Sequence, residues 1–242
     1  MIAIVRALAA AATLLAFSLD CIAGATFGLA PMRVELSAAS PTAILTVTNS
    51  GEAPVTIQVQ AYTWTQPGGK DQYEETRGFI VSPPIFTIAP GAAQIVRVAL
   101  RGKPPADIEQ AYRLIFREVP PIEETSGDRA LFRIALNMNI PLFVAPMVGA
   151  SAPKATFGLD ASLDAPRRLS IRNDGTGNLR LTALTVRQGD DKLAEQDVFV
   201  VLPGSTRYIV LPKERVKSGT PLRVEAQSNG GRVDLALPVA NP

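Results

Sequence analysis

The stretch Leu45–Val59, LTVTNSGEAPVTIQV, decides the fold. Apolar and polar side chains alternate on both sides of a central turn, which is typical of strands with one buried face. The turn Asn49-Ser50-Gly51 contains an asparagine and a glycine, the residues that most readily adopt the positive φ of a tight connection. This stretch therefore predicts a strand, a turn and a second strand.

The same plan returns in the second half of the chain. Leu169–Arg172 alternates and leads into Asn173-Asp174-Gly175, after which Leu179–Val186 alternates again. A Pro-Gly turn follows in each half, at Pro90-Gly91 and at Pro203-Gly204. Short strands separated by turn signals at this density predict an all-β fold of two immunoglobulin-like sandwiches.

The two ends of the first half set the predicted boundaries. Arg6, the apolar run Ala7–Leu19 and the small residues Ala23-Gly24-Ala25 have the pattern of a cleavable signal peptide at residues 1–25. An N-terminal membrane anchor is the alternative, but the apolar run is short for a spanning helix. The Ala-, Pro- and Gly-rich segment Ala145–Lys154 separates the halves. We therefore expect domains at residues 26–146 and 147–242 of an exported protein.

Composition excludes several classes of function. The 242 residues include 24 basic and 22 acidic side chains, so net charge offers no argument for a nucleic-acid partner. The chain has no histidine and one cysteine, which removes Ser–His and Cys–His nucleophile pairs and the common zinc sites. No phosphate-binding loop or nucleophile elbow is present. We expect a binding protein that is not an enzyme, with no cofactor and no metal.

One strand alternates unusually well. Phe132–Ile140, FRIALNMNI, places large apolar side chains at every second position: Phe132, Ile134, Leu136, Met138 and Ile140. An ordinary core strand shows the same pattern. Here, however, a polar loop precedes the stretch and the domain junction follows it, which favours an exposed edge. Such an edge would aggregate unless a partner covered it, and strand addition by a partner would do so.

At this point the sequence resembles the periplasmic chaperones of the chaperone–usher pathway, which assemble pili and related surface fibres. The resemblance rests on an ordered set of segments that covers nearly all of the first domain: Ala30–Val34, Thr48–Gly51, Gln60–Trp64, Pro83–Gly91, Tyr112–Pro121 and Phe132–Phe143. The second domain matches mainly through its plan and Asn229–Arg232. The ending Ile140-Pro141-Leu142-Phe143 is most similar to the archaic branch, which is associated with spore-coat-U-like fibre subunits.

The resemblance implies an L-shaped pair of domains with a cleft at the bend. It implies that the Phe132–Ile140 face completes an unfinished pilin-like subunit, and that Arg33 holds the C-terminal carboxylate of that subunit through charge-assisted hydrogen bonds. The family's second anchor, a lysine, is replaced here by Pro141, and Arg113 is the candidate substitute. Glu118 matches a glutamate of the family's inter-domain charge cluster, but its arginine partner is missing, so local pairing of Glu118 is the alternative.

The implied partners are pilin or spore-coat-U-like subunits and an outer-membrane usher, and the implied location is the periplasm. A fibre subunit or adhesin-type sandwich is the competing interpretation. Such a chain would need a long alternating donor extension at its mature N-terminus, and Thr26–Ala30 is too short for one. Whether the free chain self-associates through its exposed strand is left open.

Overall fold

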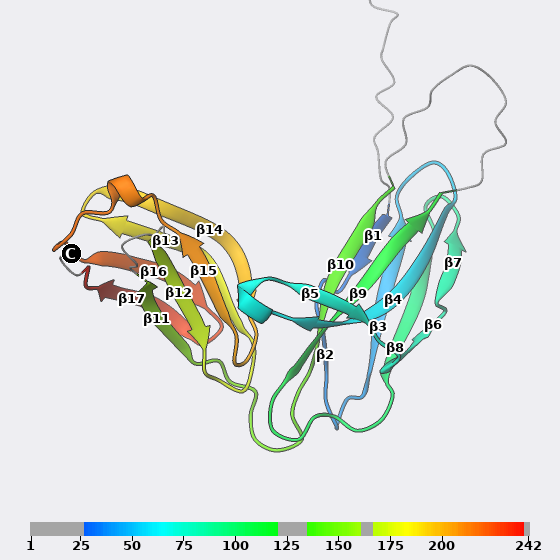
Figure 1. The fold of residues 1–242 in the computed structure, drawn as a ribbon. Helices are drawn as coiled ribbons and strands as arrows, with labels where there is room; N and C mark the ends of the chain where they lie inside the picture. Colours follow the sequence, from blue (N-terminus) through cyan, green and yellow to red (C-terminus); the bar gives the residue numbers. More distant parts are fainter. Residues whose placement is uncertain (1–26, 121–134, 161–166, 240–242) are drawn as a thin grey trace, which may run out of the picture.

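A computed structural model describes residues 27–120, 135–160 and 167–239. These residues form two β-sandwiches that meet at an angle (Figure 1). Apart from two short 3-10 turns, η1 (Pro67–Gly69) and η2 (Lys213–Arg215), the regular structure of the described part is all strand. The predicted all-β fold with two immunoglobulin-like domains is therefore confirmed. The predicted signal peptide lies outside the described residues.

The first domain packs two sheets face to face. One sheet has the order β1-β3-β8-β6, and its strands are β1 (Phe27–Ala30), β3 (Thr42–Asn49), β8 (Ala93–Leu100) and β6 (Phe79–Ser82). The other has the order β2-β10-β9-β4-β5, with β7 also paired to β4. Its strands are β2 (Val34–Leu36), β10 (Asn137–Val144), β9 (Gln110–Val119), β4 (Val55–Thr65), β5 (Gln72–Glu75) and β7 (Ile85–Ile88).

The alternation seen in the sequence sets which side chains form this core. Leu45 and Val47 of β3 are fully buried, and Ile57 and Val59 of β4 face them from the opposite sheet, almost completely buried. Their neighbours along each strand point outward, because successive side chains of a strand lie on opposite faces. Each strand of the predicted strand–turn–strand unit therefore belongs to a different sheet, and the turn connects the two layers.

The second domain repeats the plan with fewer strands. A three-stranded sheet, β11-β12-β15, is built from β11 (Ala155–Asp160), β12 (Arg168–Asn173) and β15 (Thr206–Val210). A four-stranded sheet, β14-β13-β16-β17, is built from β14 (Asp191–Val201), β13 (Leu179–Gln188), β16 (Leu222–Ser228) and β17 (Gly231–Leu237). Its core is separate from that of the first domain. Residues 145–154 connect the two, and the boundary after residue 146 stays a prediction.

A buried asparagine occupies the equivalent turn of each domain. Asn49 is wholly inaccessible; its Nδ2 donates to the carbonyl oxygens of Ala53 and Ile88, 2.8 and 3.0 Å away, and its Oδ1 accepts from Gly51 N. Asn173 makes the same kinds of contact in the second domain. The carbonyl oxygen of each asparagine also accepts a bond from the Pro-Gly turn of its own domain, at 2.9 and 2.8 Å. The repeat predicted from sequence therefore extends to hydrogen bonding.

The β4–β5 hairpin reaches from the first domain to the second (Figure 1). At its tip, the backbone of η1 packs against β15, and Arg207 Nη1 donates to the carbonyl oxygen of Gly69 at 3.1 Å. Gly69 has φ +78°, and a Cβ there would lie 2.8 Å from the carbonyl oxygen of Thr206. Only glycine combines this backbone conformation with so close an approach.

Candidate inter-domain binding site

The face of the β2-β10-β9-β4-β5 sheet that turns away from its own core carries both predicted anchor arginines. Arg33 stands just before β2, where the chain crosses from one sheet to the other, and Arg113 lies on β9. Arg113 and Arg117 are two positions of the same parity on β9, and the side chains of opposite parity between them, Leu114 and Phe116, are buried in the core. Sequence reasoning placed these residues on one face, and the burial pattern agrees.

Arg33 is held from three directions. Its Nε donates to Glu35 Oε1 at 2.7 Å, and its guanidinium lies 4.3 Å from the ring centroid of Phe143. Both terminal nitrogens lie 3.4 Å from Asn178 Oδ1 of the second domain. About a third of the side chain, 32%, is still exposed. Arg33 is therefore oriented by its neighbours without being enclosed by them.

Arg113 has unused hydrogen-bonding capacity. Its guanidinium stacks 3.7 Å from the Trp64 ring centroid, a cation–π contact, with Tyr73 at 5.9 Å. Its buried Nε has no hydrogen-bond partner, and no acidic side chain among the described residues pairs with the guanidinium. Burial lowers the pKa of Arg113 from its ordinary value. A buried donor without a partner is costly, so this group is suited to bind an anionic ligand.

Both arginines open into one cleft of about 530 Å³ between the domains. The first domain lines it with Pro31, Met32, Arg33, Trp64, Asp71, Arg113 and Pro141. The second domain lines it with Arg180, Val198, Phe199, Val200 and Arg207. Four arginines and one carboxylate therefore face the same space, which gives the cleft a positive charge.

Asp71, the one carboxylate that lines the cleft among the described residues, is already engaged. It accepts hydrogen bonds from Trp64 Nε1 at 2.9 Å and Gln66 Nε2 at 2.8 Å, and it pairs with Arg207 at 3.2 Å. Burial alone would raise the pKa of Asp71, but these hydrogen bonds and the arginine charge outweigh it and leave the pKa below its ordinary value. Asp71 therefore stays ionised and neutralises Arg207, whereas Arg113 receives no such partner.

The predicted donor face divides into three parts. Phe132 and Ile134 lie outside the described residues. Leu136 and Met138 are partly buried and pack against the first-domain core. Ile140 is fully buried in that core, so the prediction that it is offered to a partner is wrong. Ile140 lies opposite the fully buried Leu114 of β9, whereas Leu136 and Met138 lie nearer the start of the strand.

Among the described residues, no strand pairs with Asn137–Pro141 of β10 on the side away from β9, and this stretch is called the open edge. β9 pairs with β10 along its whole length, but β2 pairs only with Leu142–Val144. The Leu136 carbonyl accepts from Glu118 N on the β9 side, and Ala145 N donates to Leu36 on the β2 side. The backbone N–H and C=O groups of successive residues in an antiparallel strand point to alternate sides. The backbone groups of Asn137 and Asn139, and the carbonyl of residue 141, therefore point away from β9.

Pro141 is explained by this geometry. It lies opposite Arg113 on β9 and lines the cleft. Its position in the alternation is one where an N–H would point to the open edge, so the missing donor breaks no bond of its own sheet. Pro141 also marks the limit of any strand pairing on that edge, because it can accept but cannot donate.

Among the described residues, the Glu118 side chain bonds within its own domain. Its Oε2 accepts from Leu136 N at 3.0 Å, which is the local pairing expected where the arginine partner is missing. The glutamate that bonds to the second domain is Glu109, at the opposite end of β9. At 3.3 Å per residue, it lies about 30 Å along the strand from Glu118. It accepts from the backbone N and the Nδ2 of Asn178, at 2.9 and 2.7 Å. Sequence reasoning missed this pair, because no local pattern marks either residue.

Gln66 is a second inter-domain residue that sequence reasoning missed. Its Nε2 donates to the Val200 carbonyl at 2.9 Å, and its Oε1 accepts from Leu202 N at 2.9 Å. Next to it, Trp64 and Phe143 pack with Leu202 in a small buried cluster. The wall of the cleft is therefore tied to both domains by hydrogen bonds and by apolar contact.

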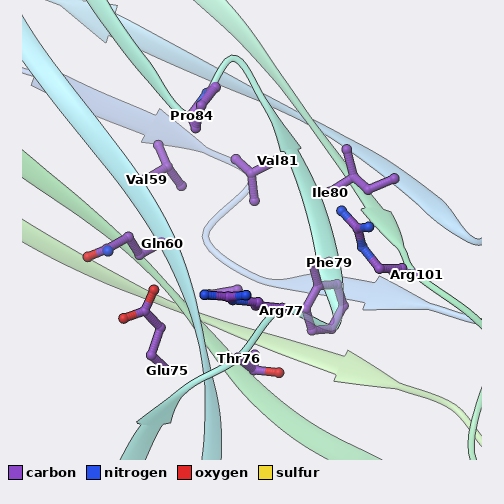
Figure 2. Close-up of a pocket in the computed structure, with 11 residues that line it drawn as sticks. Val59, Gln60, Glu75, Thr76, Arg77, Phe79, Ile80, Val81, Pro84 and Arg101 are labelled. Carbon is purple, nitrogen blue, oxygen red and sulfur yellow. The ribbon is translucent and has the colours of Figure 1, made fainter.

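A second hollow of about 530 Å³ lies within the first domain, where the neighbour of β4 changes from β7 to β5. Figure 2 shows Val59, Val81 and Pro84 around its apolar part, with Arg77 close to Phe79. None of the predicted site residues lines this hollow. Substitutions in this hollow can therefore serve as controls for substitutions in the cleft.

Within the described ranges, histidine, cysteine, aspartate and glutamate form no group of three or more that would hold a metal ion. No helix of the described part has the length and apolar character needed to cross a lipid bilayer.

Comparison with known proteins decides the family. The model of pili and flagellar-assembly chaperones, PapD N-terminal domain, matches residues 26–149, half of the chain. The chain belongs to the family of pilus-assembly chaperones. The region matched lies in the domain that carries Arg33, Arg113 and the open edge of β10. The family resemblance seen in the sequence is thereby confirmed.

The chain is also similar in sequence to individual fimbrial chaperones. The chain is 27% identical over 150 residues to the chaperone protein FimB/FhaD of Bordetella pertussis, covering 59% of each chain. It is 26% identical over 167 residues to the uncharacterized fimbrial chaperone YbgP of Escherichia coli, covering 66% of this chain and 63% of the relative. The matched region therefore spans less than two thirds of the length of these relatives.

The fold of the whole described chain has counterparts among solved chaperones. The crystal structure of the CsuC–CsuE chaperone–tip adhesion subunit complex from archaic Csu pili of Acinetobacter baumannii superposes with a TM-score of 0.68. That similarity covers 90% of this chain and 100% of the other at 21% sequence identity. The match extends over both domains, so the two-sandwich arrangement is that of solved assembly chaperones.

Proposed function

We propose that the protein is a periplasmic chaperone that binds unfinished fibre subunits by adding β10 to their incomplete sheet. The observation that carries the proposal is the open edge at 137–141, which ends beside the cleft that holds Arg33 and Arg113. A strand added there would pair with the outward backbone groups of Asn137 and Asn139.

The two arginines set the register of that strand. A C-terminal carboxylate in the cleft would receive charge-assisted bonds from Arg113, whose Nε lacks a partner, and from the exposed part of Arg33. The partly buried Leu136 and Met138 lie on the apolar face of the strand, which would turn to the interior of the subunit. Each such side chain contributes about 1.5–3 kcal/mol when fully buried.

The partners in this proposal are pilin or spore-coat-U-like subunits, as in the archaic branch, followed by an outer-membrane usher. The mechanism uses no catalytic group and no cofactor: the subunit leaves when the donor strand of the next subunit replaces β10. The archaic branch is supported by the ending Ile140–Phe143 and by the CsuC likeness in fold.

The proposal is tested by changing one backbone donor of the open edge. The full chain is co-expressed with exported fibre-type subunits, and the recovered complex is measured after affinity purification of the chaperone. Asn139→Pro removes the outward N–H, whereas the matched control Asn139→Ala keeps it and removes only the side chain. Neither change touches the bonds between β10 and β9, so both variants are expected to fold.

We expect Asn139→Ala to retain subunits and Asn139→Pro to lose most of them. Equal recovery of subunits by both folded variants would show that the edge of β10 is not the binding surface. Thermal melting of the two purified variants, with midpoints close to that of the wild-type protein, checks that the comparison is valid.

A further inference from the structure

The second domain contributes a cation to the cleft that the anchor proposal does not use. Arg180 lies near the start of β13, and its side chain is exposed and lines the cleft. In the register of the sheet it lies opposite Val200, which packs on the inter-domain cluster around Trp64. Arg180 therefore belongs to the wall of the cleft and not to the outer surface of its domain.

Hydrogen bonds with Asn229 hold the backbone of Arg180. Arg180 N donates to Asn229 Oδ1 at 2.8 Å, and Asn229 N donates to the Arg180 carbonyl at 3.2 Å. Asn229 Nδ2 also bonds to the carbonyl of Asn178, the residue whose side chain contacts Arg33. The guanidinium of Arg180 forms no ion pair with any acidic side chain of the described residues. A positioned arginine therefore lacks a counter-ion.

Charge counting indicates that one carboxylate is not enough for this cleft. Asp71 neutralises Arg207, and Glu35 pairs with Arg33, which leaves Arg113 and Arg180 without acidic partners among the described residues. A single terminal carboxylate supplies one negative charge. A ligand that matches the cleft therefore carries a second anionic group.

The spacing of β13 indicates where that group lies. Asn178, which contacts Arg33, lies just before β13, two residues from Arg180, and two residues of a strand span about 7 Å. Two residues of an extended ligand strand span the same length. We infer that Arg180 is a specificity residue that recognises an acidic side chain within the last three residues of the bound subunit. This inference rests on the proposed function of the cleft.

The test uses synthetic peptides and the full-length chaperone. An N-acetylated octapeptide of alternating valine and threonine, with aspartate third from its end and a free C-terminal carboxylate, is compared with two analogues. One has asparagine in place of the aspartate, and the other has an amidated C-terminus. Binding is followed by the fluorescence of Trp64, the single tryptophan of the chain, which lines the cleft.

We expect the wild-type protein to bind the aspartate peptide about three- to tenfold more tightly than the asparagine peptide, as one partly exposed ion pair allows. This difference in affinity between the two peptides should vanish in Arg180→Gln. It should persist in the control variant Arg187→Gln, which carries the same substitution at the far end of β13. Because the hydrogen bonds of Arg180 with Asn229 are made by the Arg180 backbone, Arg180→Gln should fold normally.

Each contrary result has its own meaning. An aspartate preference that survives in Arg180→Gln would overturn the assignment of Arg180. Indifference to C-terminal amidation would instead overturn the carboxylate anchor of the proposed function. If no peptide binds although a subunit co-purifies with the chaperone, the anion specificity of the cleft is wrong while strand addition stands.

Discussion

Replacing Arg113 by glutamine separates a binding role from a structural one. In the folded protein its guanidinium gains a cation–π contact with Trp64, which contributes about 0.5–2 kcal/mol. Against this, its buried Nε has no partner, and an unsatisfied buried donor costs about 1–3 kcal/mol. The two effects nearly cancel, so Arg113→Gln should change the free energy of unfolding by no more than about 1 kcal/mol.

The effect on the subunit complex should be much larger. A charge-assisted bond to a carboxylate contributes about 1.5–3 kcal/mol, which corresponds to roughly a 10- to 150-fold change in affinity. Most of that change is expected in the dissociation rate. Arg113→Lys keeps the charge but loses the planar fork, so it should give an intermediate rate.

Two measurements check this prediction. Urea unfolding followed by circular dichroism gives the stability, and release of a fluorescently labelled subunit into excess wild-type chaperone gives the dissociation rate. Arg101→Gln, in the separate hollow of the first domain, is the matched control and should leave both quantities unchanged. The reasoning is refuted if Arg113→Gln lowers stability by about 3 kcal/mol or more and leaves subunit release unchanged.

Two further changes probe the frame of the cleft. Gly69→Ala should destabilise the protein by about 1–2 kcal/mol more than Gly91→Ala, since both have positive φ but only a Cβ at residue 69 would meet β15, at the Thr206 carbonyl oxygen and the Tyr208 ring. Equal unfolding free energies of the two variants would count against the close approach. Asp71→Asn should lower the free energy of unfolding by about 1–2 kcal/mol near neutral pH, because it removes the negative charge that strengthens two side-chain hydrogen bonds and forms the ion pair with Arg207. The pKa of Asp71 is lowered on folding from its ordinary value of 3.8, so its stabilisation is full above that value and is lost as the pH falls through the folded pKa. Urea unfolding should therefore show the gap between wild type and Asp71→Asn closing in acid, and a gap independent of pH would contradict the proposed network.

Parts of the candidate site were predictable because a known pattern marks them. Arg33 and Arg113 share one cleft, and the resemblance to assembly chaperones had singled out both. Their role as carboxylate anchors stays a prediction. By contrast, Gln66 and Glu109 bond to residues 136 and 69 positions away in the chain. Neither lies in a periodic pattern that would mark it, so the sequence contains no signal for these inter-domain bonds.

The donor strand shows the same division within a single segment. Alternation correctly places Leu136, Met138 and Ile140 on one face, but it does not distinguish the partly buried pair from the fully buried isoleucine. That difference depends on how deep each position lies in the packed sandwich, whose core is formed by residues far apart in the chain.

The sequence by itself determined the strands, the turns and the repetition of one plan in two domains. These features are local, because side-chain direction repeats every two residues and the turn residues act within their own loop. Only the tertiary structure decided that part of the edge of β10 stays unpaired among the described residues, that Glu109 joins the domains, and that arginines from both domains face one cleft. The physical reason is that a backbone edge or a charge is satisfied by whichever residue the fold brings beside it, and here those residues are far apart in the chain.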